Sequence, residues 1–231
     1  MSAAAGPAAD LQKALRSPRE TQLRLLRCII TQNAHTSFGL KHDFATLKTF
    51  EDYTNRIPIR SYEEFEPWVT RVAGGEPNVL TRDPIVAFEQ TGGSTSGRKL
   101  VPYTEAQLKS FGASVLPWLE NLLARRPAIR SGKAYVAVSP KIRMPARTSG
   151  GVQIGLPSEG AYLGQEIALA FGQILVNGLA AGRAEDLREW QLETLCDLVL
   201  ADNLSFVSVW SPTFVTRLVD ILVNEADAVM E

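Results

Sequence analysis

The 231-residue sequence is poor in the side chains that most metal and redox sites require, with two cysteines and two histidines. It contains no Cys-x-x-Cys pair, which argues against a disulfide framework and the common structural zinc sites. Cys28 and Cys196 both fall among apolar residues at helical spacing, so we expect two buried free thiols. No acidic residue near His35 or His42 forms a metal-ligand pattern, and we therefore expect no metal site built from this chain alone.

The sequence also lacks long apolar runs and an excess of either charge. No uninterrupted apolar stretch is long enough to cross a membrane, and the N-terminus has no basic region followed by an apolar stretch. We therefore expect a cytoplasmic protein without a membrane partner. Lysine and arginine number 24 against 25 aspartate and glutamate, so no basic excess predicts nucleic-acid recognition. The Ala- and Gly-rich start, Met1–Ala9, is expected to be flexible.

Apolar periodicity and capping signals predict an α/β fold in which strands alternate with helices. Ser17, Ser61 and Thr104 each precede a Glu or Gln three residues later, a pattern that begins helices. Residues 141–160 are expected to be loop. The predicted helices cover approximately residues 18–33, 61–73, 104–122, 167–182, 187–198 and 212–222, and the predicted strands cover 84–90, 99–103, 134–139 and 204–210.

The stretch from Gln90 to Lys99 carries the strongest chemical signal. It follows a predicted buried strand and contains three glycines, four hydroxyl side chains and two cations. Glycines allow tight bends that bring backbone N–H groups near a ligand, and a concave row of N–H groups binds anions. Hydroxyl groups and a cation at Arg98 or Lys99 would add hydrogen bonds and positive charge for phosphate oxygens. From composition alone, a plain hairpin turn with solvated charges explains the same residues.

The loop is not a Walker A phosphate loop, although Gly92 and Gly97 have the right spacing. Arg98 stands where that motif needs lysine, and Lys99 stands where it needs serine or threonine for magnesium. A Walker loop also opens directly into a helix, whereas residues 99–103 are predicted to be extended. The sequence therefore predicts a strand–loop–strand arrangement, which adenylate-forming enzymes use to hold the ATP phosphates.

The same loop resembles that of the auxin-responsive acyl acid amido synthetases, the plant hormone-conjugating enzymes and their bacterial relatives. In that family the loop reads approximately S/T-S-G-T/S-T-x-G-x-x-K. Gly92 replaces a serine of this pattern, and Lys99 falls one place early, as if one residue were deleted. The positions that match in order are Thr91, Gly93, Ser94, Thr95 and Gly97.

The likeness extends beyond the loop, over about residues 30–231. Further segments look like family segments and occur in the family's order, which makes the set more specific than the loop by itself. These segments are residues 36–40, 57–63, 83–88, 102–104 and 209–214.

The resemblance implies that residues 10–231 form the N-terminal portion of an adenylate-forming domain. In that family, ATP and a carboxylic acid form an acyl adenylate, and an amine, typically of an amino acid, then forms an amide. Magnesium would accompany the ATP. Lys99 would be the catalytic residue that stabilises moving charge, with an ordinary strand lysine as the alternative. The residues implied to bind phosphate are Thr91, Gly92, Gly93, Ser94, Thr95, Ser96 and Gly97.

Other motifs of the family are missing. The chain has no Gly-Asp dipeptide for the ribose, and Ser158-Glu159 lies too early to be the family's adenine-contacting Ser-Glu. No counterpart of the smaller C-terminal domain is present, so we expect a truncated chain that is inactive by itself and that pairs with the missing half. Two alternatives stay open. One is an acyl-CoA ligase-like segment that delivers the acyl group to a thiol; the other is a non-catalytic remnant that binds nucleotide or a partner.

Overall fold

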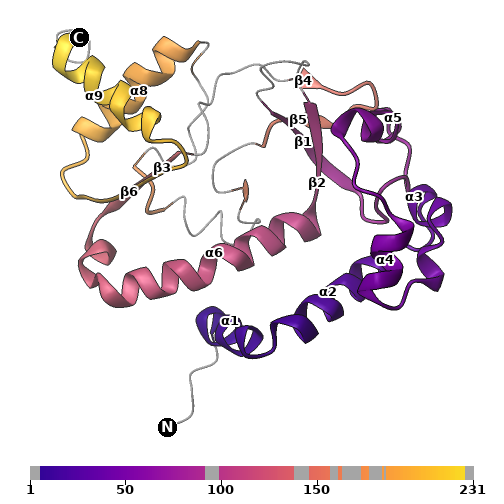
Figure 1. The fold of residues 1–231 in the computed structure, drawn as a ribbon. Helices are drawn as coiled ribbons and strands as arrows, with labels where there is room; N and C mark the ends of the chain where they lie inside the picture. The colour runs from indigo at the N-terminus through magenta and orange to yellow at the C-terminus, as the bar shows by residue number, and fades with distance from the viewer. Residues whose placement is uncertain are drawn as a thin grey trace. The chain divides into compact units, whose positions relative to one another are not determined.

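The computed structural model describes residues 6–91, 99–137, 146–156, 161–162, 173–176, 184 and 186–226. Helices and strands are interleaved through these residues, which confirms the predicted α/β class (Figure 1). The helices are α1 (Pro7–Arg16), α2 (Pro18–Gln32), α3 (Ser37–Lys41), α4 (Phe50–Arg56), α5 (Tyr62–Ala73), α6 (Glu105–Arg125), α8 (Leu187–Val199) and α9 (Pro212–Asn224), with 3-10 helices η1 (Phe44–Thr46) and η2 (Pro127–Ser131). The strands are β1 (Ile85–Thr91), β2 (Lys99–Thr104), β3 (Lys133–Ala137), β4 (Ala146–Arg147), β5 (Gln153–Ile154) and β6 (Leu204–Val209).

The chain divides into two compact units, which we describe separately. Unit 1 comprises Met1–Ser110 and Pro145–Leu156, and unit 2 comprises Phe111–Met144 and Pro157–Glu231. The hairpin formed by β1 and β2 belongs to unit 1, and so does the sequence between these strands that was predicted to bind phosphate.

Unit 1 contains a four-stranded sheet in the order β2-β1-β5-β4 (Figure 1). Strand β1 pairs antiparallel with β2 and parallel with β5, where Phe88 lies opposite Ile154. The prediction of loop for residues 141–160 is wrong at β4 and β5. These strands have two residues each, which is too short to show the alternation of apolar and polar residues that reveals a strand.

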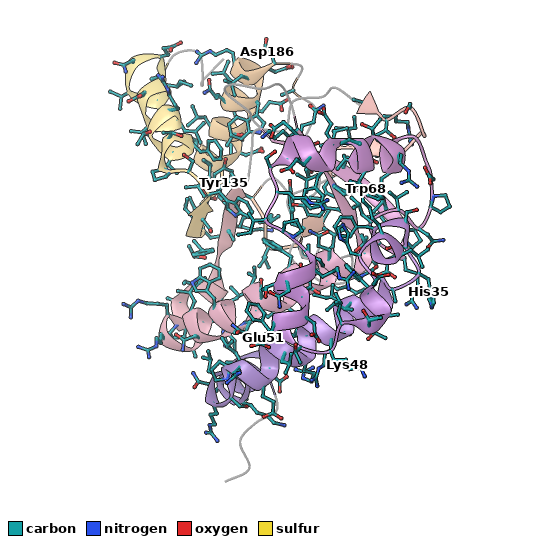
Figure 2. All side chains as sticks on the ribbon, turned by 45° about the vertical axis from the view of Figure 1, so that its right-hand side comes forward. His35, Lys48, Glu51, Trp68, Tyr135 and Asp186 are labelled. Atoms are coloured by element: carbon teal, nitrogen blue, oxygen red, sulfur yellow. The ribbon has the colours of Figure 1, made fainter. Side chains whose placement is uncertain are left out.

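Two apolar clusters form the core of unit 1. The first joins α5 to the sheet through the buried Val69, Val72, Ala73, Val79 and Phe88. The second joins α2, α3 and η1 through the buried Ile30, Phe38, Phe44 and Leu47, and Trp68, labelled in Figure 2, packs against both clusters. Helix α5 is thereby fixed against the strands that frame the loop.

His42 is a buried residue of unit 1 whose charge state affects stability. It is 6% exposed, its ring centroid lies 4.4 Å from that of Phe38, and its Nε2 has no hydrogen-bond partner within the described part of the chain. Burial, and then the positive charges of Arg60 and Lys41, lower the pKa of His42 from 6.5. As the pH falls, the unfolded chain therefore takes up a proton before the folded protein does.

We expect the free energy of unfolding to decrease as the pH drops from 7.5 to 5, by at most about 1.4 kcal/mol per pH unit for this histidine. The contribution of His42 is fully present above pH 6.5 and is lost between 6.5 and the lowered pKa of the folded state. Urea denaturation across this range should give a flatter pH dependence for His42→Asn. The exposed His35, labelled in Figure 2, provides the control, because His35→Asn should keep the wild-type slope. Equal slopes in all three proteins would exclude His42 as the cause.

Unit 2 contains the parallel pair β3–β6, packed against α8 and α9. Tyr135 of β3, labelled in Figure 2, is 2% exposed and belongs to the core of this unit. Asp186, also labelled, begins α8, because its carboxylate accepts a hydrogen bond from the N–H of Glu189. The buried residues of this core are Tyr135, Ala137, Leu195, Leu218 and Ile221.

The predicted helix over residues 167–182 is wrong where the structure describes it. Leu175 forms a parallel β-bridge with Ala134. The Ala134 N–H donates to the Ile174 carbonyl at 2.8 Å, and the Val176 N–H donates to the Ala134 carbonyl at 2.9 Å. The chain therefore forms a single bridge to β3 here, between turn residues. The rest of the predicted helix lies outside the described residues.

The expectation of two buried thiols is also wrong. Cys28 of α2 is exposed and Cys196 of α8 is partly exposed, and neither is part of a disulfide. At the N-terminus, α1 begins at Pro7, inside the segment that was expected to be flexible, and residues 1–5 lie outside the described part.

Candidate functional site

The candidate site is the hairpin in unit 1 whose two strands enclose the Gly/Ser/Thr-rich sequence. Strand β1 ends at Thr91, strand β2 begins at Lys99, and these two residues are register partners. The chain thus enters and leaves the loop as extended strands, which confirms the predicted strand–loop–strand arrangement and excludes a Walker A geometry. Residues 92–98 lie outside the described part, so the predicted Gly92, Gly93, Ser94, Thr95, Ser96 and Gly97, with the side chain of Thr91, are not placed.

Strand β1 is anchored on both edges and by its core side chain. Phe88 is completely buried, and its carbonyl accepts a hydrogen bond from the Gly155 N–H at 2.7 Å. The next residue, Glu89, accepts a hydrogen bond from the Leu156 N–H at 2.7 Å. Burial, followed by the negative charge of Glu89, raises the pKa of Tyr103 on β2. The burial of Phe88 and these two hydrogen bonds fix the position of β1, from which the loop starts.

Strand β2 is held at its first residues by the start of α5. The Tyr62 hydroxyl donates to the Leu100 carbonyl at 3.0 Å and accepts from the Leu100 N–H at 2.9 Å. Because β2 is the edge of the sheet, these two backbone groups would otherwise face away from a strand partner. The Tyr62 hydroxyl thus provides hydrogen-bond partners for the edge strand immediately after the loop.

Lys99 also lies against the first turn of α5. Its Nζ is 3.2 Å from Glu63 Oε1 and 5.1 Å from the ring centroid of Tyr62. The pKa of Glu63 is lowered to about 2, first by a hydrogen bond from its own N–H, then by the Ser61 hydroxyl, and then by the hydrogen bond and charge of Lys99. The Lys99 side chain keeps 30% of its surface exposed, and the Glu63 carboxylate is its anionic partner.

Sequence reasoning missed the part played by Tyr62 and Glu63. Both residues follow the helix-capping signal at Ser61, and both lie in or beside the stretch that resembles the family, residues 57–63. The Ser61 N–H does donate to Glu64 Oε2 at 2.8 Å, as the capping signal predicts. Nothing in the local pattern, however, indicates that this helix start lies beside Lys99, more than thirty residues further along the chain.

The described residues offer neither a metal site nor a membrane span. No group of three or more His, Cys, Asp and Glu side chains within them could hold a metal ion. None of the helices in the described ranges combines the length and apolar character that crossing a bilayer requires. A cavity of about 260 Å³ in unit 1 is lined by residues 75–85 with Val72 and Val152. It does not include Tyr62, Glu63 or Lys99, so we assign it no part in the site.

Comparison with known proteins gives a family match and several similar proteins. The model described as the GH3 family N-terminal domain matches residues 8–231. The chain is 30% identical over 138 residues to the indole-3-acetic acid-amido synthetase GH3.5 of Arabidopsis thaliana, a match covering 58% of this chain and 22% of that protein. It is 33% identical over 113 residues to the probable indole-3-acetic acid-amido synthetase GH3.7 of Oryza sativa subsp. japonica, covering 44% of this chain and 18% of that protein.

A similarity to a solved structure agrees with this family match. The AtGH3.15 acyl acid amido synthetase in complex with 2,4-DB matches with a TM-score of 0.76 and 17% identity, over 99% of this chain and 41% of that one. At this identity the likeness shows the fold, and it confirms the predicted α/β architecture of the N-terminal part of such a synthetase. The chain spans about two-fifths of that structure. Together, the family match and the fold show that this chain belongs to the GH3 family, as an N-terminal domain.

Proposed function

We propose that this chain supplies the ATP-phosphate-binding part of an acyl acid amido synthetase. The observation that carries the proposal is the β1–β2 hairpin, which encloses the Gly/Ser/Thr-rich sequence and has the partly exposed cation of Lys99 immediately after that sequence. Backbone N–H groups of such a loop, its hydroxyl groups and a nearby ammonium are the donors that phosphate oxygens require. Membership of the GH3 family, whose relatives here are named amido synthetases, supports the same reaction class.

In the proposed reaction, a carboxylic acid attacks ATP to give an acyl adenylate and pyrophosphate. The amine of an amino acid then displaces AMP and forms the amide. Magnesium would arrive on the phosphates of the nucleotide. The substrates of this chain are therefore proposed to be ATP, a carboxylic acid and an amino acid.

The proposed roles of the residues follow from their positions. Thr91 is the last residue of β1 in the ladder with β2, and it would contribute the first hydroxyl group of the loop. Residues 92–97 would bring their N–H and hydroxyl groups to the phosphates. Lys99 would stabilise the negative charge that moves onto the leaving pyrophosphate. An ammonium held next to the place where charge develops needs little reorganisation during the reaction, which is why its fixed position matters.

Calorimetric titration of this chain with MgATP tests the proposal. The double variant Lys99→Ala/Ser94→Ala should bind at least about tenfold more weakly than wild type. A hydrogen bond to a charged group contributes about 1.5–3 kcal/mol, and about 1.4 kcal/mol corresponds to tenfold in Kd. Lys109→Ala/Ser110→Ala removes the same two side-chain types from exposed positions of α6 and should bind like wild type. Absence of binding by a folded wild-type chain, or equal binding by the loop variant, would contradict the proposed phosphate site.

Two assays separate this function from the alternatives. Acid-dependent exchange of pyrophosphate into ATP reports adenylate formation, so exchange by this chain would argue against a non-catalytic nucleotide-binding module. With exchange present, amide formation from an amino acid indicates the amido synthetase. Thioester formation from coenzyme A would indicate an acyl-CoA ligase instead.

A further inference from the structure

Two consecutive residues at the start of α5, Tyr62 and Glu63, contact the two residues that leave the loop. Tyr62 bonds both backbone groups of Leu100, and Glu63 pairs with Lys99. The Lys99 ammonium therefore has an anionic partner on one side and an aromatic ring 5.1 Å away. The first turn of α5 therefore contacts both the backbone of Leu100 and the ammonium group of Lys99.

The carboxylate of Glu63 occupies the position of an anion that binds Lys99. Its Oε1 lies 3.2 Å from Nζ, at the long end of the range of N–H···O hydrogen bonds. Hydrogen bonds from its own N–H and from Ser61, together with Lys99, hold the pKa of this carboxyl at about 2. Glu63 thus stays negatively charged at neutral pH and competes with any phosphate for the same ammonium.

We propose that Glu63 is a positioning residue that holds Lys99 at the exit of the loop before nucleotide binds and yields it to the phosphate oxygens when they enter. The second half of this inference rests on the proposed function. Glu63 is exposed, at 55%, and Lys99 is partly exposed, at 30%, so water and salt weaken the attraction between the two side chains. A multiply charged phosphate forms the stronger charge-assisted bond, which makes the exchange of partners favourable.

Acetylation of lysine side chains, followed by peptide mass spectrometry on the full chain, tests the first half. Acetylation requires approach of the reagent to the Lys99 Nζ, and the contact with the Glu63 carboxylate restricts that approach. Glu63→Gln should therefore raise the acetylation rate of Lys99 about two- to fivefold, the factor that the stabilisation of an exposed ion pair corresponds to. Glu66→Gln neutralises an exposed carboxylate on the same helix and should leave the rate unchanged, and Lys109 serves as the internal reference. An unchanged rate in Glu63→Gln would overturn the proposal.

Inorganic tripolyphosphate, added as the probe, tests the second half. It should protect Lys99 from acetylation in wild type, and it should do so at a lower concentration in Glu63→Gln, because the competing carboxylate is gone. Equal protection curves in the two proteins would overturn the exchange of partners while leaving phosphate binding in place. Failure to protect Lys99 in either protein, with the faster acetylation of Glu63→Gln retained, would instead overturn the proposed phosphate site and leave the holding role of Glu63 standing.

Discussion

Replacing Phe88 by alanine should lower the free energy of unfolding of unit 1 by about 3–5 kcal/mol. Phe88 is completely buried at the centre of the cluster that joins α5 to the sheet. Protein interiors are close-packed, so removing the ring both loses transfer free energy and leaves a cavity that neighbours fill incompletely. Phe88 also lies opposite Pro102 on β2 and Ile154 on β5, and the loss therefore affects both edges of the strand that leads into the loop.

Urea denaturation followed by circular dichroism measures this loss, and hydrogen exchange of the β1 and β2 amides locates it. Val86 provides the matched control, since it lies on the same strand but is 43% exposed. Val86→Ala should cost less than about 1 kcal/mol, because a half-exposed side chain has less buried area to lose. Similar losses in the two variants would show that β1 is not packed as described, and that the loop lacks the rigid base proposed for it.

Much of unit 1 could be predicted because its signals are local. The apolar run before the glycines gives β1, the extended residues after them give β2, and Thr104 begins α6 by accepting a hydrogen bond from the Gln107 N–H at 3.1 Å. The strand–loop–strand arrangement followed from these signals, and the family followed from the order of matching segments. The roles of the loop residues and of Lys99 stay predictions, which the binding experiments address.

Tertiary proximity could not be predicted in the same way. The two residues of β5 are assigned to a strand because they pair with β1. A segment of two residues is too short to show an apolar periodicity that would predict a strand. The pairing of Glu63 with Lys99 likewise depends on how α5 packs against β2. Cys28 shows a different limit: α2 has apolar residues on more than one face, and its Leu25 and Ile29 are exposed as well. Helical spacing identifies an apolar side chain but not which face the fold buries.

Replacing Gly39 by alanine should destabilise unit 1 by more than about 3 kcal/mol, at or beyond the upper end of the usual cost of overpacking. A Cβ at Gly39 would lie 2.0 Å from the Asn33 carbonyl oxygen and 3.1 Å from the backbone of Ala34. That oxygen cannot easily move, because it accepts hydrogen bonds from both the N–H and the hydroxyl group of Thr36, at 3.1 and 2.8 Å. Thr36 in turn accepts from the Gly39 N–H at 2.9 Å, which closes a small network around the glycine.

This network explains how residues 36–39 are held in the fold of unit 1. Thr36 is 1% exposed, and Phe38 between it and Gly39 belongs to the buried cluster of α2, α3 and η1. Thermal denaturation should therefore show a large decrease in the melting temperature for Gly39→Ala. The melting temperature of Leu40→Ala should change little, since Leu40 is 63% exposed on the same short helix. A Gly39→Ala protein as stable as Leu40→Ala would mean that the backbone between α2 and α3 shifts freely, and that this segment is not the rigid element described here.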